Sequence, residues 1–136
     1  MRVYLAGRIS DCSDEECNGW REQASVALKD LATTVNPMVR DARGREDEPG
    51  ISKFVVEGDK ADIDSCDAIL VRYKKPSVGT MMEVIYAWEH GKRVILWVDR
   101  LSGLSPWLRY HSHAVVTSLF EAACVIQQEK LKEEKQ

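Results

Sequence analysis

Short runs of apolar or β-branched residues, separated by longer amphipathic stretches, constrain the fold of this chain more than any other feature. Five such runs are present, at residues 2–6, 33–35, 68–71, 93–98 and 114–116. A strand that is apolar throughout is buried on both faces, and such strands alternating with helices form a parallel sheet. The pattern therefore predicts an α/β fold with a five-stranded parallel sheet and helices on both faces.

The segments between these runs carry helical signals. Ser13 and Glu16 have the spacing of a capping box, in which each side chain binds the other residue's backbone N–H group. Apolar residues then recur at helical spacing. Three more helices are expected: one from Ser52, one over residues 79–90, and one after a second capping box at residues 118–121.

Two segments lack a regular pattern. Residues 38–50 combine charges, glycine and proline without a period, and we expect a long surface loop of the kind that is often functional. Residues 127–136 are expected to be a frayed C-terminal tail. Because the chain shows no repeat and no interdomain linker, a single domain over residues 1–136 is predicted.

Composition argues against several classes of protein. A chain with 44% hydrophobic and 30% charged residues is typical of soluble globular proteins, and no apolar run approaches the roughly 18 residues of a membrane span. A net charge of −3 provides no basic surface for a nucleic-acid polymer. The apolar stretch at residues 2–6 is too short for a secretory signal, so a cytoplasmic protein is expected.

The cysteines and histidines do not form a metal-binding pattern. Cys12, Cys17, Cys66 and Cys124 are scattered without a C-x-x-C pair, so reduced thiols are expected, with neither a disulfide framework nor a zinc site. His111 and His113 alternate as they would on a strand, but two histidines without a third ligand do not indicate a metal. No metal and no cofactor are therefore expected.

The predicted sheet indicates where a ligand would bind. In a parallel sheet this is the crevice beyond the carboxyl ends of the strands, which here carries residues 7–10, 36–45, 73–83 and 99–113. Glu83 lies in this region, in the first turn of a predicted helix, where free N–H groups favour an ionised carboxylate. Two interpretations are open: a favourable charge at a helix end, or a catalytic group.

A longer pattern favours catalysis. Over about residues 2–126 the chain resembles the nucleoside 2-deoxyribosyltransferase family. The resemblance rests on VYLAG at residues 3–7, Asp67 ahead of the third strand, and S-x-G-T-x-x-E at residues 77–83 followed by Tyr86-Ala87 and Gly91-Lys92. The resemblance implies a flavodoxin-like fold and an enzyme in which Glu83 attacks the anomeric carbon of a 2-deoxyribose.

The resemblance also implies a second carboxylate. The family's spacing places it eight residues before Asp67, at Asp59, where it handles the proton of the departing or incoming base. Asp62 and Asp64 are alternatives nearby. Breaking an N-glycosidic bond develops positive charge on the sugar and negative charge on the base, so an ionised carboxylate and a proton donor are both needed.

The remaining site residues follow from the same resemblance. Tyr4 is expected to contact the nucleophile, Gly7 to leave space for ligand, and the segment after residue 36 to shape a base pocket. Residues after position 105 are expected to complete the pocket of a neighbouring subunit, which implies a homodimer or a higher homo-oligomer. The catalytic residues implied are Glu83, Asp59 and Tyr4, and the substrate-binding residues are Gly7, Arg8, Asn36, Pro37, Ser77, Gly79, Thr80, Tyr110, His111 and Ser112.

Three arginines in the predicted loop have two interpretations. Arg40, Arg43 and Arg45 would either contribute to the base pocket or only balance the acidic residues of the same loop.

The expected activity is transfer of 2-deoxyribose from a deoxynucleoside to another nucleobase. Ser77 raises an alternative, because transferring members usually have an aspartate there that binds the 5′-hydroxyl group. A neutral residue resembles the related 5′-monophosphate N-glycosidases, which hydrolyse a deoxynucleotide to base and sugar phosphate, and Arg8 could add a cation. A nucleotide-binding protein without turnover is a third possibility, since fold alone never excludes it.

Overall fold

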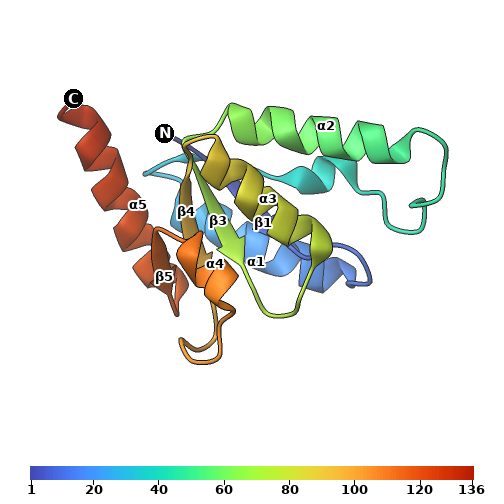
Figure 1. Ribbon diagram of the computed structural model, residues 1–136. Coiled ribbons are helices and arrows are strands. Elements are labelled where there is room, and N and C mark those ends of the chain that lie inside the picture. Colours follow the sequence, from blue (N-terminus) through green and yellow to red (C-terminus); the bar gives the residue numbers. More distant parts are fainter.

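Five parallel strands form the centre of the molecule, which a computed structural model describes over residues 1–136 (Figure 1). Their order across the sheet is β2-β1-β3-β4-β5, which is the flavodoxin-like order, so the predicted fold is confirmed. The strands are β1 (Arg2–Gly7), β2 (Thr33–Val35), β3 (Ala68–Arg72), β4 (Arg93–Trp97) and β5 (Ala114–Val116).

The order of the strands reverses between β1 and β3. The chain passes from β1 to β2 on one side and then returns to β3 on the other side of β1. Gly7 at the end of β1 is in register with Arg72 at the end of β3. The crevice expected for a ligand therefore lies beyond these two residues.

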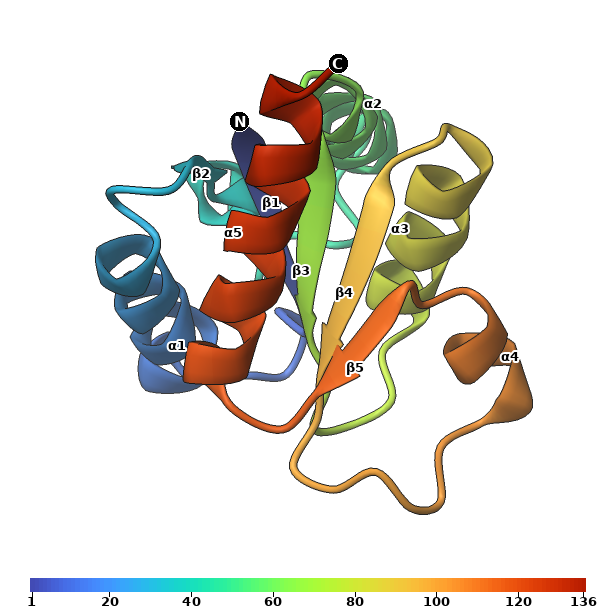
Figure 2. The ribbon, with the colours of Figure 1, turned by 90° about the vertical axis from the view of Figure 1, so that its left-hand side faces the viewer.

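Helices cover both faces of the sheet (Figure 2). α1 and α5 pack on one face, and α2, α3 and α4 pack on the other. The helices are α1 (Asp14–Ala27), the short 3-10 helix η1 (Pro37–Arg40), α2 (Ile51–Asp64), α3 (Val78–Glu89), α4 (Pro106–Tyr110) and α5 (Leu119–Glu134). None of them combines the length and the apolar character needed to cross a bilayer.

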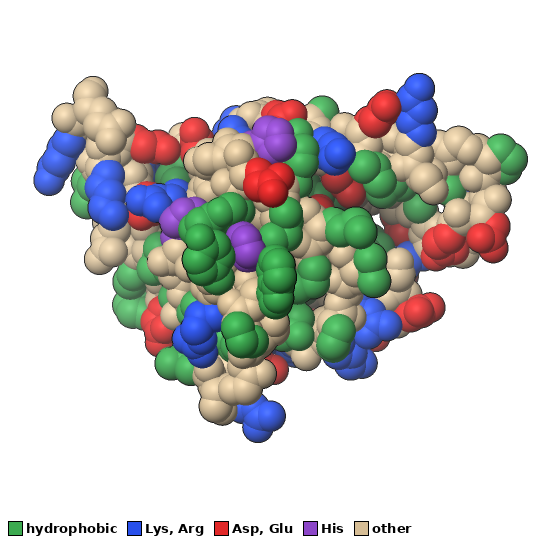
Figure 3. All heavy atoms as spheres, in the orientation of Figure 1, with side chains coloured by type: hydrophobic (Ala, Val, Ile, Leu, Met, Phe, Trp, Pro, Cys, Tyr) green, Lys and Arg blue, Asp and Glu red, His purple; other side chains and the backbone are tan.

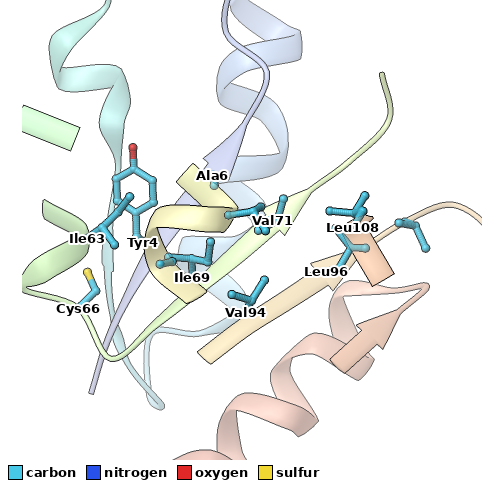
Figure 4. Close-up of a cluster of buried hydrophobic side chains, with 12 residues drawn as sticks. Tyr4, Ala6, Ile63, Cys66, Ile69, Val71, Val94, Leu96 and Leu108 are labelled. Atoms are coloured by element: carbon cyan, nitrogen blue, oxygen red, sulfur yellow. The ribbon is translucent and has the colours of Figure 1, made fainter. Parts of the chain in front are cut away.

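The core has two halves because successive residues of a strand point to opposite faces. In β1, Val3 and Leu5 join the cluster under α1 and α5, whereas Tyr4 and Ala6 join the cluster under α2 and α3. Figure 4 shows the second cluster, in which the Tyr4 ring packs beside Ile63 and Ile69. Burial on both faces explains why β1 and β3 read as continuous apolar runs.

Two short helices, η1 and α4, lie where the sequence predicts none. Each begins with a capped turn and a proline in the first helical position, which suits a helix start. The Asn36 side chain accepts from the N–H group of Met38 (2.9 Å), and the Ser105 hydroxyl accepts from that of Trp107 (3.2 Å). The capping residues lie next to the helices in the sequence. A helix of one turn is nevertheless too short to show the apolar periodicity by which a helix is predicted.

The last helix, α5, also differs from the prediction. It continues to Glu134, so most of the segment expected as a frayed tail is helical. At its beginning the Ser118 hydroxyl accepts from the N–H group of Glu121 (3.1 Å), but the Glu121 carboxylate binds the N–H group of Thr117 instead of that of Ser118. Only half of the predicted capping box forms there.

The capping box at the beginning of α1 is complete. The Ser13 hydroxyl accepts from the N–H group of Glu16, and the Glu16 carboxylate accepts from that of Ser13, both at 3.1 Å. This helix leads from the end of β1 back across the sheet, as predicted.

Candidate active site

Glu83 lies on α3 with its carboxylate beside β1. Ser77 caps the helix by accepting a hydrogen bond from the N–H group of Thr80 (3.3 Å), and Thr80 and Val84 are buried. On this side of the helix the hydroxyl group of Tyr4 donates a hydrogen bond to Glu83 Oε2. Because Glu83 lies beyond the first turn of α3, its interpretation as a helix-end charge is wrong.

The surroundings of Glu83 determine its affinity for a proton. Burial disfavours the ionised carboxylate and raises its pKa from 4.5 to about 8, and the negative charge of Asp59 acts in the same direction. The hydrogen bond from Tyr4 and the positive charges of Arg21 and Arg40 act in the opposite direction. Burial, together with the charge of Glu83, also raises the pKa of the Tyr4 hydroxyl, which therefore remains a hydrogen-bond donor.

A second carboxylate, that of Asp59 on α2, borders the same cavity. Its Oδ1 atom accepts hydrogen bonds from Arg40 Nη2 (2.8 Å) and Arg40 Nε (3.3 Å). Burial raises the pKa of Asp59, and the bonds from Arg40 oppose this rise. Since Asp59 has a cation in direct contact and Glu83 has none, Asp59 loses its proton at the lower pH.

The two alternative aspartates are engaged elsewhere. Asp62 Oδ2 binds Arg40 Nη2 at 2.6 Å, and the Asp64 carboxylate accepts from the Tyr86 hydroxyl at 2.8 and 2.9 Å. Neither lines the cavity. Of the three aspartates of α2 considered from the sequence, only Asp59 borders the same cavity as Glu83.

A cavity of about 280 Å³ opens at the carboxyl end of β1, between the beginning of α3, residues 51–59 of α2 and the segment after β2. A mostly apolar hollow of about 600 Å³ adjoins it between α2 and α3. These volumes are of the order that small-molecule sites have. Of the residues predicted for the site, those that line the smaller cavity are Gly7, Pro37, Asp59, Ser77, Gly79, Thr80 and Glu83; Asp59, Gly79 and Glu83 border both hollows.

Arg8 and Asn36 do not line the cavity. Arg8 borders a separate hollow together with Trp20 and Trp97. Asn36 caps η1, so its side chain is used within its own segment. Arg8 is thus not placed to bind a phosphate group beside Ser77.

Tyr110, His111 and Ser112 lie at the end of α4 and just after it, away from the cavity of their own chain. The Trp88 ring packs against the rings of Tyr110 and His111, with centroid distances of 5.6 and 5.4 Å. Figure 3 shows hydrophobic side chains gathered around histidines over α3 and α4. The expected strand-like alternation of the histidines is wrong, because His111 caps the end of α4 and neither histidine lies in a strand. His113 Nδ1 accepts from the N–H group of Val94 (2.9 Å).

Gly7 lines the cavity, but a protein side chain is what excludes a larger residue there. A Cβ atom at this position would lie 2.7 Å from Cζ2 of Trp20 on α1. Packing against Trp20 is thus sufficient to require a glycine here, and the expectation that Gly7 leaves room for a ligand stays a prediction.

The arginines of the 38–50 segment divide between the two interpretations. Arg45 pairs with Glu48 (3.1 Å), so it balances an acidic residue of the same segment. Arg43 pairs with Asp41 (2.7 Å) but also lines the cavity, so it fits both interpretations. Arg40 instead reaches α2 and binds Asp59, a contact that the sequence does not reveal.

Arg21 is a second residue that sequence reasoning missed. Its side chain is fully buried beneath the carboxyl end of β1. It donates hydrogen bonds to the carbonyl groups of Cys17 (2.6 Å), Gly7 (3.0 Å) and Leu5 (3.3 Å). An arginine in an amphipathic helix is normally exposed, so the sequence carries no signal for this role.

Solved structures resemble the chain in fold. A 2-deoxyribosyltransferase from Bacillus psychrosaccharolyticus is 19% identical, with a TM-score of 0.75 and 90% of each chain covered. The CMP N-glycosidase BcmB from Clostridium botulinum is 18% identical, with a TM-score of 0.60, covering 93% of this chain and 98% of that one. A conserved protein from Enterococcus faecalis V583 is 16% identical, with a TM-score of 0.70 and coverages of 94% and 98%.

No curated protein matches the chain significantly in sequence. The model of the nucleoside 2-deoxyribosyltransferase family matches residues 3–132, which include all five strands except the first residue of β1, and the segments that carry Tyr4, Asp59 and Glu83. The chain therefore belongs to the nucleoside 2-deoxyribosyltransferase family.

Proposed function

We propose that this protein is a nucleoside 2-deoxyribosyltransferase, which passes 2-deoxyribose between nucleobases through a covalent ester on Glu83. The observation that carries the proposal is the hydrogen-bonded pair of Tyr4 and Glu83 at the wall of a cavity that Asp59 also borders. A positioned nucleophile and a second carboxylate on one cavity are what a two-step displacement at a sugar carbon needs.

The first step forms the ester. An ionised oxygen of Glu83 attacks C1′ of the sugar while the C1′–N bond breaks and its electron pair passes to the nitrogen of the base. Asp59 donates a proton to the departing base. In the second step a nitrogen of another base attacks C1′, Asp59 takes the proton of that base, and the electron pair of the ester bond returns to Glu83.

This scheme requires one proton shared between two carboxylates. Glu83 must be ionised while Asp59 is protonated, although Glu83 binds a proton more tightly in the free protein. Because two negative charges close together are unfavourable, the pair retains one proton up to about pH 8, the pKa of Glu83. In the reactive form this single proton lies on Asp59, which is the less populated of its two positions.

The charges around the cavity favour an uncharged deoxynucleoside. Two arginines line it, Arg40 and Arg43, and each is already paired with a carboxylate. Three acidic side chains, those of Glu46, Asp59 and Glu83, line it as well. Because Asp59 and Glu83 share one proton, the charges on this wall balance, and both arginines are engaged by carboxylates. A phosphate dianion would therefore find no free cation there, whereas a free 5′-hydroxyl group needs none.

A second candidate is hydrolysis of a 2′-deoxynucleoside 5′-monophosphate. The observation in its favour is that the hydroxyl groups of Ser10 and Ser77 line the cavity near the beginning of α3, where donors to a phosphate are found. The covalent step would be the same, with water in place of the second base.

Chromatography of four reactions tests the proposal: a deoxynucleoside or its 5′-monophosphate, each with and without a second base, with Glu83→Ala as the control. A new nucleoside, absent from the control, supports transfer. Free base from the monophosphate alone supports the second candidate. Ligand binding without turnover of any substrate would refute both and leave a nucleotide-binding protein.

Trapping the intermediate tests the role of Glu83 directly. A 2-fluoro-2-deoxy nucleoside slows hydrolysis of the ester, so mass spectrometry of digested protein is expected to find the sugar attached to Glu83. An adduct on another residue would refute the assignment.

We also propose that the protein is a homo-oligomer in which the end of α4 contributes to a neighbouring cavity. The supporting observation is that Trp107 and Tyr110 of this short helix are 75% and 70% exposed, although both are large aromatic residues. Light scattering after size-exclusion chromatography measures the oligomeric state. Loss of both assembly and activity in Tyr110→Ser would support the proposal, and an active monomer would refute it.

A further inference from the structure

Arg40 reaches from η1 across α2 and binds two carboxylates of that helix. Its Nη2 atom lies 2.8 Å from Asp59 Oδ1 and 2.6 Å from Asp62 Oδ2. We propose that Arg40 is a positioning residue, which fixes the Asp59 carboxylate for proton transfer, a role that rests on the function proposed above. We further propose that Gly58 is a glycine because Arg40 must pass over it.

The contacts of Arg40 orient Asp59 without covering it. Both hydrogen bonds to Asp59 end on the Oδ1 atom, so the Oδ2 atom is not engaged by a cation. Asp62 holds the same guanidinium group from a second direction. Because a guanidinium group is planar and rigid, these contacts fix the position of Asp59 Oδ1 and leave Oδ2 outside the contact with Arg40.

The path of Arg40 over α2 depends on Gly58. A Cβ atom at Gly58 would lie 2.4 Å from Arg40 Nε and 2.5 Å from Arg40 Cδ, closer than such atoms approach. Glycine in the interior of a helix costs about 1 kcal/mol relative to alanine. Here the missing side chain makes room for the guanidinium group, so alanine at this position would displace Arg40 without changing any charged residue.

The charge of Arg40 suits an acid–base partner. Arginine does not give up its proton, so it stabilises the ionised form of Asp59 without competing as an acid. It shares its charge with Asp62, and burial still keeps the pKa of Asp59 above its ordinary value. Asp59 is thus held in place and remains able to accept a proton, as general acid–base catalysis requires.

Three variants separate the position of Arg40 from its charge. Arg40→Met removes both the bonds and the cation. Arg40→Lys keeps a cation but cannot hold two carboxylates with a planar group. Gly58→Ala keeps the arginine and blocks its path.

Two substitutions away from the cavity serve as matched controls. In Gly19→Ala, another glycine-to-alanine change inside a helix, the new Cβ would meet only the side chain of Glu15. Arg93→Met removes an arginine that pairs with Glu129 at 3.1 Å, outside the cavity.

The measurement is kcat and KM for deoxyribosyl transfer as a function of pH. Arg40→Met and Gly58→Ala are expected to lower kcat on the order of 10- to 100-fold with little change in KM, because a misplaced proton donor affects the chemical step. Both limbs of the pH profile are expected to move to higher pH in Arg40→Met, since the cation lowers the pKa of Asp59 and of Glu83. Arg40→Lys is expected to have a lowered kcat, with both limbs of its pH profile near their wild-type positions. Both control variants are expected to have the kcat and the pH profile of the wild type.

Two results would overturn the proposal. The first is an Arg40→Met variant whose kcat and pH profile are those of the wild type, and the second is an equal change of kcat in Gly58→Ala and Gly19→Ala. If circular dichroism shows that Arg40→Met does not fold, Arg40→Lys and Gly58→Ala decide by the same criteria. Failure of the proposed function would be distinct, because the wild-type protein itself would then transfer no sugar.

Discussion

The hydroxyl group of Tyr4 donates a hydrogen bond to the carboxylate of Glu83, although 79 positions separate the two residues in the chain. Tyr4 is fully buried in β1, and α3 brings Glu83 to it by packing on the sheet over β3 and β4 and against β1. The pair therefore places a half-buried carboxylate at the edge of a cavity. What this carboxylate can do depends on its proton, and the following predictions test that dependence.

Replacing Glu83 by glutamine is expected to abolish transfer, with kcat falling at least about 10⁴-fold, because the amide cannot form the ester. The same variant tests the raised pKa through stability. Between the unfolded value of 4.5 and about 8 the folded protein binds more protons than the unfolded chain, so wild-type stability falls as pH rises through this window. The Glu83→Gln variant has no carboxylate at this position, so its stability does not fall in this way.

Thermal unfolding of both proteins at several pH values measures the difference. The advantage of Glu83→Gln over wild type is expected to grow from about pH 5 to about pH 8 by on the order of a few kcal/mol, and then to stay constant. A difference independent of pH would show that the carboxylate is not buried as described.

Tyr4→Phe removes the donor to Glu83 and keeps the ring in the core. Without this hydrogen bond the pKa of Glu83 rises further, so the upper limb of kcat/KM against pH is expected to move to higher pH. A fall in kcat of about 10- to 100-fold is expected as the nucleophile loses its fixed position. An unchanged pH profile with a lowered kcat would mean that the phenol acts only by packing.

The single proton shared by Asp59 and Glu83 predicts a bell-shaped pH profile of kcat/KM in the wild type. Its upper limb is expected near pH 8, where the pair loses the shared proton. In Asp59→Asn only Glu83 titrates, and its pKa falls because the neighbouring negative charge is gone. The residual activity of that variant is therefore expected to rise with pH to a plateau.

Both profiles are measured with a substrate whose base leaves readily, so that the variant remains measurable. An upper limb that persists in Asp59→Asn would argue that another group supplies the proton.

Arg21→Met is expected to destabilise the fold by about 3 kcal/mol, because the buried carbonyl groups at the end of β1 lose a charged donor. Urea denaturation measures the change, and Arg93→Met, at a more exposed ion pair, is the control with an expected effect below about 1 kcal/mol. Equal effects of the two substitutions would contradict the role of Arg21 in holding the strand end.

Gly7→Ala is expected to cost about 1–3 kcal/mol of stability, since the new Cβ atom would lie 2.7 Å from Trp20 Cζ2. Trp20→Phe removes that atom, so the double variant is expected to lose less than the sum of the single variants in a double-mutant cycle. If Gly7 instead served only a ligand, Gly7→Ala would raise KM, leave stability unchanged, and show no coupling to Trp20.

Local patterns account for what was predictable about the fold and the site. Continuous apolar runs at the positions of β1, β3 and β4 require burial on both faces, and this requirement is met only by a parallel sheet between helices. The S-x-G-T-x-x-E segment, with its preceding strand, placed Glu83 at the carboxyl edge of that sheet. Spacing from Asp67 selected Asp59 over its neighbours, although only by resemblance.

The contacts that define the site join residues distant in sequence, and no local pattern encodes them. In the sequence Arg40 is one of three similar arginines in a charged segment, and no local pattern explains a glycine at position 58. The contact between these two residues exists only because α2 packs beside η1. Arg21 looked like an exposed helical residue until α1 was packed under the end of β1.

The sequence by itself determined the alternation of five strands with four longer helices and the position of Glu83 on the third of these helices, because these depend on patterns of nearby residues. Only the tertiary structure decided that this carboxylate faces a buried phenol and has a pKa near 8. The reason is physical: desolvation and charge–charge interactions depend on distances in space, and these are established only when α2 and α3 pack side by side on the sheet.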